Sequence, residues 1–185
     1  MKDFSVEIEL LKNINMQDSP LQIPKNNLKK GTIQEDDVRV YIQEYVNTQI
    51  EELACSDTKK ELGSILLGSP VQLNGKIHVI ISAFIEAKYA DATASTLTFT
   101  HETWNYVHSE QSRLYPGLKI IGWQHTHPGY GVFLSSFDLF IQENFFNMPF
   151  QIAYVIDPIR KNCGFFQWKD NKVQRLGGFF LYHDA

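Results

Sequence analysis

The segment from His125 to Asp138 reads HTHPGYGVFLSSFD, and it holds the residues that decide how this chain is interpreted. Two histidines stand two residues apart, and Ser135 precedes Asp138 by three positions. Side chains at positions i and i+2 of an extended strand point to the same face, so His125 and His127 can converge on one small cation. Two imidazoles and a carboxylate, with a fourth position left for water, are the composition of a catalytic zinc site. The segment therefore predicts a metal-dependent hydrolase.

The overall composition is that of an ordinary folded protein. The chain has 185 residues, of which 43% are hydrophobic and 21% charged, and its formal net charge is −4. This length suits one domain with a sizeable core. The slight negative charge argues against a nucleic-acid binder that uses a broad basic surface. The two cysteines, Cys55 and Cys163, are too few and too far apart for a disulfide framework or a cysteine-based zinc site.

The N-terminal residues differ in character from the rest of the chain. Charges at Lys2 and Asp3 stand where a signal peptide needs an apolar core, and no apolar run is long enough to cross a membrane, so we expect a cytoplasmic protein. Alternation over Val6–Leu10 predicts a short strand, and the polar stretch after it, up to Gly31, has turn or loop chemistry. We therefore expect an N-terminal extension over residues 1–35 and one domain over residues 36–185.

Strand and helix patterns alternate through the remainder of the chain. Helical periodicity is found over residues 45–54 and 101–114, and Asn74-Gly75 is typical of a tight hairpin turn. The predicted strands are residues 38–42, 64–68, 77–85, 97–100, 118–127 and 152–156, followed by a terminal hairpin of residues 164–168 with 173–182. This mixture predicts an α/β fold with a central, partly antiparallel sheet flanked by helices.

The two elements around the histidines have a more specific pattern. In the strand over residues 118–127, alternation places Ile121 and Trp123 on the same face as the histidines. A helix is predicted to begin at Ser135, and its four-residue spacing of Phe137, Ile141 and Phe145 is interpreted as a core-facing stripe.

Other interpretations of these residues are possible. Ser135 and Asp138 also have the spacing of a helix capping box, and the histidines by themselves are compatible with a loop. The sequence His101-Glu102 begins like a zincin motif, but Asn105 stands where its second histidine is needed. A serine hydrolase is disfavoured because Ser135 lacks the Gly-x-Ser-x-Gly elbow.

The full spacing resembles that of the JAMM family, the metal-dependent proteases of the MPN/Mov34 fold. Its pattern is His-x-His-Pro, six residues, Ser, two residues and Asp, and every fixed position is met, including Pro128. The family also has an upstream glutamate seven residues before a glycine that closes an apolar strand, and Glu61 and Gly68 supply this arrangement. The resemblance spans roughly residues 38–182, and the histidine segment is most similar to compact bacterial members.

The resemblance implies a fold, a cofactor and roles for particular residues. It implies an MPN fold with a mixed, curved central sheet, so that residues 36–185 form a JAMM metalloprotease domain. His125, His127 and Asp138 would hold one Zn2+ ion, Glu61 would act as general base, and Ser135 would donate a hydrogen bond to the oxyanion. Ser64 departs from the glycine that many members have, which affects packing more than chemistry. An inserted second zinc site, found in some eukaryotic members, is not expected here.

The resemblance also implies a substrate class. We expect a zinc-dependent peptidase or isopeptidase that cleaves after the C-terminal tail of a ubiquitin-like protein, in precursors or conjugates. Tyr130 and Phe133 are candidates to contact that tail. A bacterial ubiquitin-like modification or antiphage system, with its conjugation enzymes as partners, is the expected setting. Processing of a sulfur-carrier protein and a non-catalytic scaffold of the same fold are the alternatives; neither nucleic acid nor a membrane is an expected partner.

Overall fold

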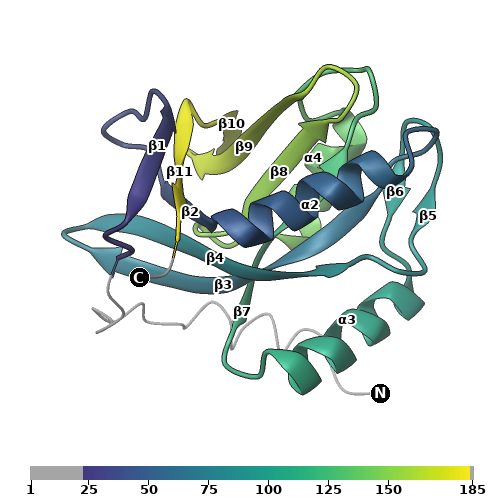
Figure 1. Ribbon diagram of the computed structural model, residues 1–185, viewed down its shortest axis with the longest axis horizontal. Coiled ribbons are helices and arrows are strands. Elements are labelled where there is room, and N and C mark those ends of the chain that lie inside the picture. Colours follow the sequence, from purple (N-terminus) through teal and green to yellow (C-terminus); the bar gives the residue numbers. More distant parts are fainter. Residues whose placement is uncertain (1–22, 184–185) are drawn as a thin grey trace.

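The computed structural model describes residues 23–183, so the predicted strand Val6–Leu10 lies outside the described residues. Most of its strands form one mixed nine-stranded sheet with the order β1-β11-β2-β4-β3-β7-β8-β9-β10 (Figure 1). In chain order these strands are β1 (Asn27–Gly31), β2 (Arg39–Gln43), β3 (Gly63–Leu73), β4 (Lys76–Glu86), β7 (Lys119–Thr126), β8 (Ile152–Asp157), β9 (Asn162–Lys169), β10 (Lys172–Arg175) and β11 (Gly178–Tyr182). The predicted α/β class and mixed central sheet are confirmed.

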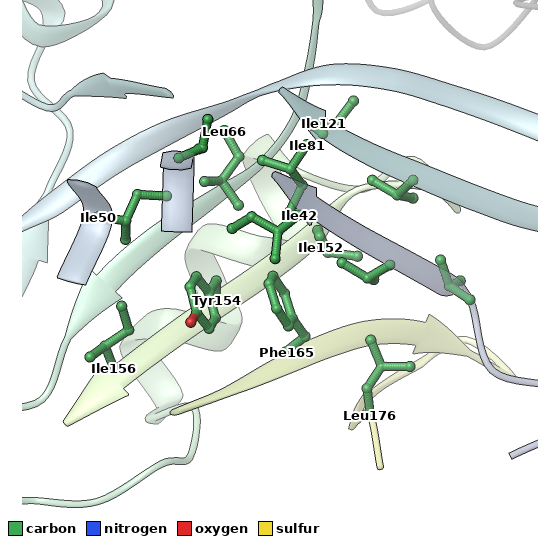
Figure 2. Close-up of a cluster of buried hydrophobic side chains, with 14 of the residues drawn as sticks. Ile42, Ile50, Leu66, Ile81, Ile121, Ile152, Tyr154, Ile156, Phe165 and Leu176 are labelled. Carbon is green, nitrogen blue, oxygen red and sulfur yellow. The ribbon is translucent and has the colours of Figure 1, made fainter. Parts of the chain in front are cut away.

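Helices cover both faces of this sheet. The helices are α2 (Glu44–Ser56), α3 (His101–Leu114) and α4 (Ser136–Phe145), and a separate two-stranded sheet joins β5 (Asp91–Ala92) to β6 (Leu97–Thr98). Figure 1 shows α2 lying across the front of the sheet. Its buried residues Val46, Ile50 and Ala54 share one hydrophobic cluster with the sheet, and Figure 2 shows Ile50 and Leu66 among the side chains of that cluster. A second cluster, which includes Val107 of α3 and Ile141 of α4, lies on the other face.

A bulge in β7 changes the predicted side-chain pattern. In the β3–β7 register, Leu66 pairs with Gly122 and Leu67 pairs with Ile120, so Ile121 is the extra residue. A bulge shifts the side-chain alternation by one position. Ile121 accordingly belongs to the cluster under α2, whereas Trp123 belongs to the cluster under α3 and α4. The prediction that Ile121 and Trp123 share a face is therefore wrong.

The two ends of the described chain meet in the sheet. Residues 27–31, for which turn or loop structure was expected, form strand β1, which pairs antiparallel with β11. The terminal hairpin is confirmed only for β9 and β10, because β11 leaves it and lies parallel to β2. The pairing partners of β11 are distant in sequence, and no local pattern specifies them. The domain boundary at residue 35 stays a prediction.

Helix α4 begins where the sequence predicts, but it buries a different set of residues. Its N-cap Ser135 forms a capping box with Asp138. Phe137 and Phe145 are 37% and 52% exposed, so the expected Phe137/Ile141/Phe145 core stripe is wrong. The buried positions of the helix are Asp138, Ile141 and Gln142. Their spacing of three and four residues matches the helical repeat better than a strict four-residue row, which drifts around the helix.

The helices of the described residues are all too short or too polar to cross a membrane.

Candidate metal centre

The predicted ligands come from two neighbouring elements. His125 is the second-last residue of β7, and His127 follows just beyond the strand. Asp138 lies in the first turn of α4. The backbone of β7 is held between β3 and β8, with His125 paired to Gly63 and Val155. Trp123 stacks on His125 with ring centroids 4.3 Å apart, which fixes the imidazole plane. His125 therefore projects from an interior strand of the sheet, and His127 from the residue directly after it.

The three side chains converge as their spacing predicts. The Nε2 atoms of His125 and His127 are 3.0 Å apart. Asp138 Oδ1 is 3.4 Å from His125 Nε2, and Asp138 Oδ2 is 3.3 Å from His127 Nε2. All three residues are buried. Within residues 23–183 they are the one group of three or more histidine, cysteine or acidic residues whose ligand atoms all lie within 4.8 Å of one another.

Asp138 also has a role in the helix. Its Oδ2 accepts a hydrogen bond from the Ser135 amide at 2.7 Å, and its own amide donates to Ser135 Oγ at 3.1 Å. Burial alone would raise the pKa of Asp138, but hydrogen bonds from His125 and His127 hold it well below its usual range. Asp138 is thus both a member of the predicted capping box and a predicted ligand, and neither interpretation excludes the other.

Glu61 approaches the histidines from the start of β3. Its Oε1 is 3.8 Å from His127 Nε2. Its amide donates to Thr93 O at 2.8 Å, which anchors this residue to the segment between β5 and β6. Burial raises the pKa of Glu61 to about 7, with the Asp138 charge adding to the effect and His127 opposing it. The structure therefore brings Glu61, His125, His127 and Asp138 together.

These residues fit a divalent cation. The donor set of two imidazole nitrogens and a carboxylate oxygen is one that zinc accepts. Buried acids and imidazoles at this density need a compensating partner. For Glu61 Oε2 and His125 Nδ1, both buried, no partner is found among the residues that the structure describes. His127 Nδ1 lies 3.3 Å from Gly131 O, so a proton on Nδ1 leaves the Nε2 lone pair free for a cation.

The two candidate substrate-contact residues lie on the loop between the ligands. Phe133 is 45% exposed, and its ring centroid is 4.7 Å from that of His127. Tyr130 is 54% exposed. Both side chains are therefore on the surface at the site, although their contact with a substrate stays a prediction.

A cavity of about 400 Å³ opens beside Glu61. It lies between the start of β3, the end of β4 and the segment that follows β4, and its lining includes Gly63, Glu86, Lys88 and Tyr89. Gly63 has no side chain to fill this space, and a Cβ atom there would lie 2.3 Å from Leu97 Cδ2. A side chain at position 63 would therefore displace the Leu97 side chain.

Sequence reasoning missed one residue next to the site, Asp157. This buried carboxylate at the end of β8 accepts hydrogen bonds from the amides of Gly129 and Gly131, in the loop that follows His127. The signal that could have found it is the dipeptide Asp157-Pro158 directly after an apolar strand, since Asp at a strand end commonly bonds nearby backbone amides.

The chain is similar to known proteins in sequence and in fold. Residues 35–149, more than half of the chain, match the family model described as JAB1/Mov34/MPN/PAD-1 ubiquitin protease. The solution structure of protein DSY2949 from Desulfitobacterium hafniense has a TM-score of 0.59 at 15% identity, over 79% of this chain and 94% of that one. At this identity the likeness concerns the fold alone.

Several curated proteins are similar over part of their length. COP9 signalosome complex subunit 5 of Candida glabrata is 31% identical over 159 residues, which cover 76% of this chain and 31% of that protein. The NAD(+) hydrolase TcpA of a Theionarchaea archaeon is 34% identical over 106 residues, 56% of this chain and 29% of that protein. The 26S proteasome regulatory subunit rpn11 of Schizosaccharomyces pombe is 45% identical over 46 residues, 24% of this chain and 15% of that protein.

The chain spans less than a third of the length of each of these three relatives. The family model, by contrast, covers the sheet from β2 through β7 together with helices α2, α3 and α4. The matched range also contains Glu61, both histidines and Asp138. The mixed sheet is consistent with the MPN fold of this family. The chain belongs to the JAB1/Mov34/MPN/PAD-1 family.

Proposed function

We propose that this protein is a zinc-dependent peptidase or isopeptidase that cleaves after the C-terminal tail of a ubiquitin-like protein. The observation that carries the proposal is the convergence of three buried ligand atoms with a carboxylate beside them, inside a fold whose family description is that of a ubiquitin protease. A scaffold without activity has no need of Glu61, whose burial costs stability.

In this proposal, His125, His127 and Asp138 hold one Zn2+ ion. When bound, zinc supplies Lewis acidity, which polarises a substrate carbonyl and lowers the pKa of water towards about 7. The chain orients the ligands. The Trp123 ring stacks on the His125 ring and restrains its orientation, and the Gly131 carbonyl accepts a hydrogen bond from Nδ1 of His127. Both contacts pre-orient the ligands.

Glu61 is the proposed general base and acid. Burial raises the pKa of its carboxyl to about 7 in the metal-free protein, and its Oε1 lies 3.8 Å from His127 Nε2, beside the proposed ligands. In this role Glu61 takes the proton of the attacking water at Oε2 and passes it to the departing amine. Ser135 is the proposed oxyanion donor. Its N-cap contact uses a lone pair of Oγ, so this contact does not consume the hydroxyl proton.

The cavity beside Glu61 is the proposed place for the substrate tail. A flexible, extended tail can lie against the ends of strands with its backbone bonded to them. Glu86 and Lys88 at the lining offer charges of both signs, and Tyr89 offers an apolar face. Tyr130 and Phe133, on the loop between the ligands, are the further proposed contacts.

The proposed setting is a cytoplasmic ubiquitin-like modification system of bacterial type, such as an antiphage system, with its conjugation enzymes as partners. This setting rests on the resemblance of the histidine segment to compact bacterial members. Processing of a sulfur-carrier protein uses the same chemistry and differs only in the substrate.

The experiment is cleavage of fusions in which several ubiquitin-like proteins precede a reporter. Purified protein loaded with zinc is expected to cut at least one fusion directly after the tail. A chelator abolishes the cut, and added Zn2+ restores it. Ala92→Trp, placed in the cavity lining, is the matched variant and is expected to raise KM without releasing zinc. Stoichiometric zinc without cleavage of any fusion or conjugate would favour the scaffold, and cleavage that resists the chelator would refute the metal mechanism.

A further inference from the structure

We propose that Asp157 is a positioning residue for the metal centre, fixing the loop after His127 so that this histidine presents Nε2 to the cation. This inference rests on one part of the proposed function, the binding of a cation at the histidines, and does not depend on the substrate. Asp157 does not touch any of the three ligand side chains; it acts through the backbone of residues 129–131.

The Asp157 carboxylate is saturated with backbone amides. Its Oδ1 accepts from Gly129 at 2.9 Å and from Ile159 and Arg160 at 3.0 Å each. Its Oδ2 accepts from Gly131 at 2.7 Å. The side chain is 0% exposed. Burial alone would raise the pKa of Asp157, but these amides hold it below its usual range, so the carboxylate is charged.

The loop is shaped to make these bonds. Gly129 and Gly131 have φ values of +80° and +95°, which residues with a side chain rarely adopt. This conformation turns two amides of one loop towards a single carboxylate. Two glycines spaced by one residue are therefore required by the Asp157 contact as well as by the turn.

The last link joins the loop to the ligand. Gly131, whose amide is held by Asp157 Oδ2, places its carbonyl oxygen 3.3 Å from His127 Nδ1. A carbonyl only accepts, so this contact suits an imidazole that donates from Nδ1 and presents Nε2 to the cation. Outer partners of metal-binding histidines commonly set their tautomer in this way, and the loss of such a partner typically weakens metal affinity about 10–100-fold.

Asp157→Asn tests this link selectively. An asparagine can keep one oxygen on the amides of Gly129, Ile159 and Arg160, but it then points an NH2 group at the Gly131 amide, where two donors face each other. The matched control is Asp37→Asn. Asp37 is likewise a buried carboxylate, 5% exposed, and it accepts from Gln34 N and Gln167 Nε2 instead of the loop.

The readouts are the Zn2+ affinity, measured by competition with a chromophoric chelator, and the visible absorption spectrum of the Co2+-loaded protein. Asp157→Asn is expected to weaken Zn2+ binding about tenfold or more and to alter the Co2+ spectrum. Asp37→Asn is expected to change neither. A folded Asp157→Asn variant with the affinity and spectrum of the unmodified protein would overturn the proposal.

Two NMR measurements test the proposal should Asp157→Asn not fold. In the unmodified, metal-free protein, the amides of Gly129 and Gly131 are expected to exchange slowly with solvent. In the zinc-loaded protein, His127 is expected to keep its proton on Nδ1. Fast exchange, or a zinc-loaded His127 protonated on Nε2, would refute the proposal. If the unmodified protein bound no zinc, the proposed function would fail by itself, whereas the exchange rates would still report on Asp157.

Discussion

Leu62 and Thr126 are joined by a reciprocal pair of hydrogen bonds. The Leu62 amide donates to Thr126 Oγ1 at 2.8 Å, and the Thr126 amide donates to Leu62 O at 2.9 Å. Each residue is the direct neighbour of a site residue, since Glu61 precedes Leu62 and Thr126 lies between the two histidines. This pair therefore sets the distance between the proposed general base and the proposed ligands.

Thr126→Val removes the hydroxyl but keeps the shape of the side chain. The Leu62 amide then loses its acceptor, which lowers the free energy of unfolding by about 1 kcal/mol. We expect kcat to fall because Glu61 is less well positioned, while the zinc affinity stays the same because the ligands are unchanged. Thr126→Ser keeps the hydroxyl and serves as the control. Equal kcat in the valine and serine variants would contradict this view of the pair.

Glu61→Gln separates metal binding from turnover. Glutamine retains the size of the side chain but cannot accept the proton, so kcat is expected to fall about 10²–10⁴-fold with full zinc content. Turnover of the tail fusions and zinc content by elemental analysis provide the test. Glu52→Gln, at an exposed position of α2, should behave as the unmodified protein. Turnover of Glu61→Gln at the unmodified rate would show that another group acts as base.

The same residue makes the stability of the metal-free protein pH-dependent. The pKa of Glu61 is about 7 in the folded protein, against an ordinary value of 4.5. Between these values the folded protein holds a proton that the unfolded chain has released, so stability falls as the pH rises through this window and the penalty is complete above about pH 7. Its full size is about 3 kcal/mol. Urea unfolding at pH 5 and pH 8 should show Glu61→Gln gaining stability relative to the unmodified protein at the higher pH. If the difference in stability between the two proteins did not grow with pH, Glu61 would not be a buried carboxylate without a compensating partner.

Tyr130→Ala and Phe133→Ala test the proposed substrate contacts. Removal of an exposed aromatic ring that touches the substrate should raise KM several-fold and leave the zinc content unchanged. Phe140→Ala, 56% exposed and further along α4, is the matched control. If neither loop variant changes KM, the two rings serve only to pack the loop.

Local sequence patterns predicted the features that depend on neighbours in the chain. The convergence of His125 and His127 follows from two-residue alternation in a strand, and the start of α4 follows from its capping box at Ser135 and Asp138. The bulge at Ile121, which changes the face to which the side chains of β7 point, could not be predicted, because it depends on the register of β7 against β3. The position of β11 between β1 and β2 depends likewise on pairing across most of the chain.

The residues of the candidate site likewise differ in how far local patterns could predict them. The two histidines and Asp138 lie within one short segment, whereas Glu61 lies 66 residues before His127. Its approach to 3.8 Å is a product of the β3–β7 pairing, and only the family pattern indicated it beforehand. Asp157 was missed for a related reason, since its partners Gly129 and Gly131 lie on a loop 28 and 26 residues earlier in the chain.

The pairing of β1 with β11 has a consequence for the order of events during synthesis. In the part of the chain that the structure describes, β1 adjoins β11 alone, so residues 27–31 have no strand to bind until residues 178–182 have left the ribosome. The edge of the sheet beside β2 therefore remains open through translation of everything between them. Pulsed amide labelling of nascent chains should find β1 protected last, although it is the first of the described strands to be made.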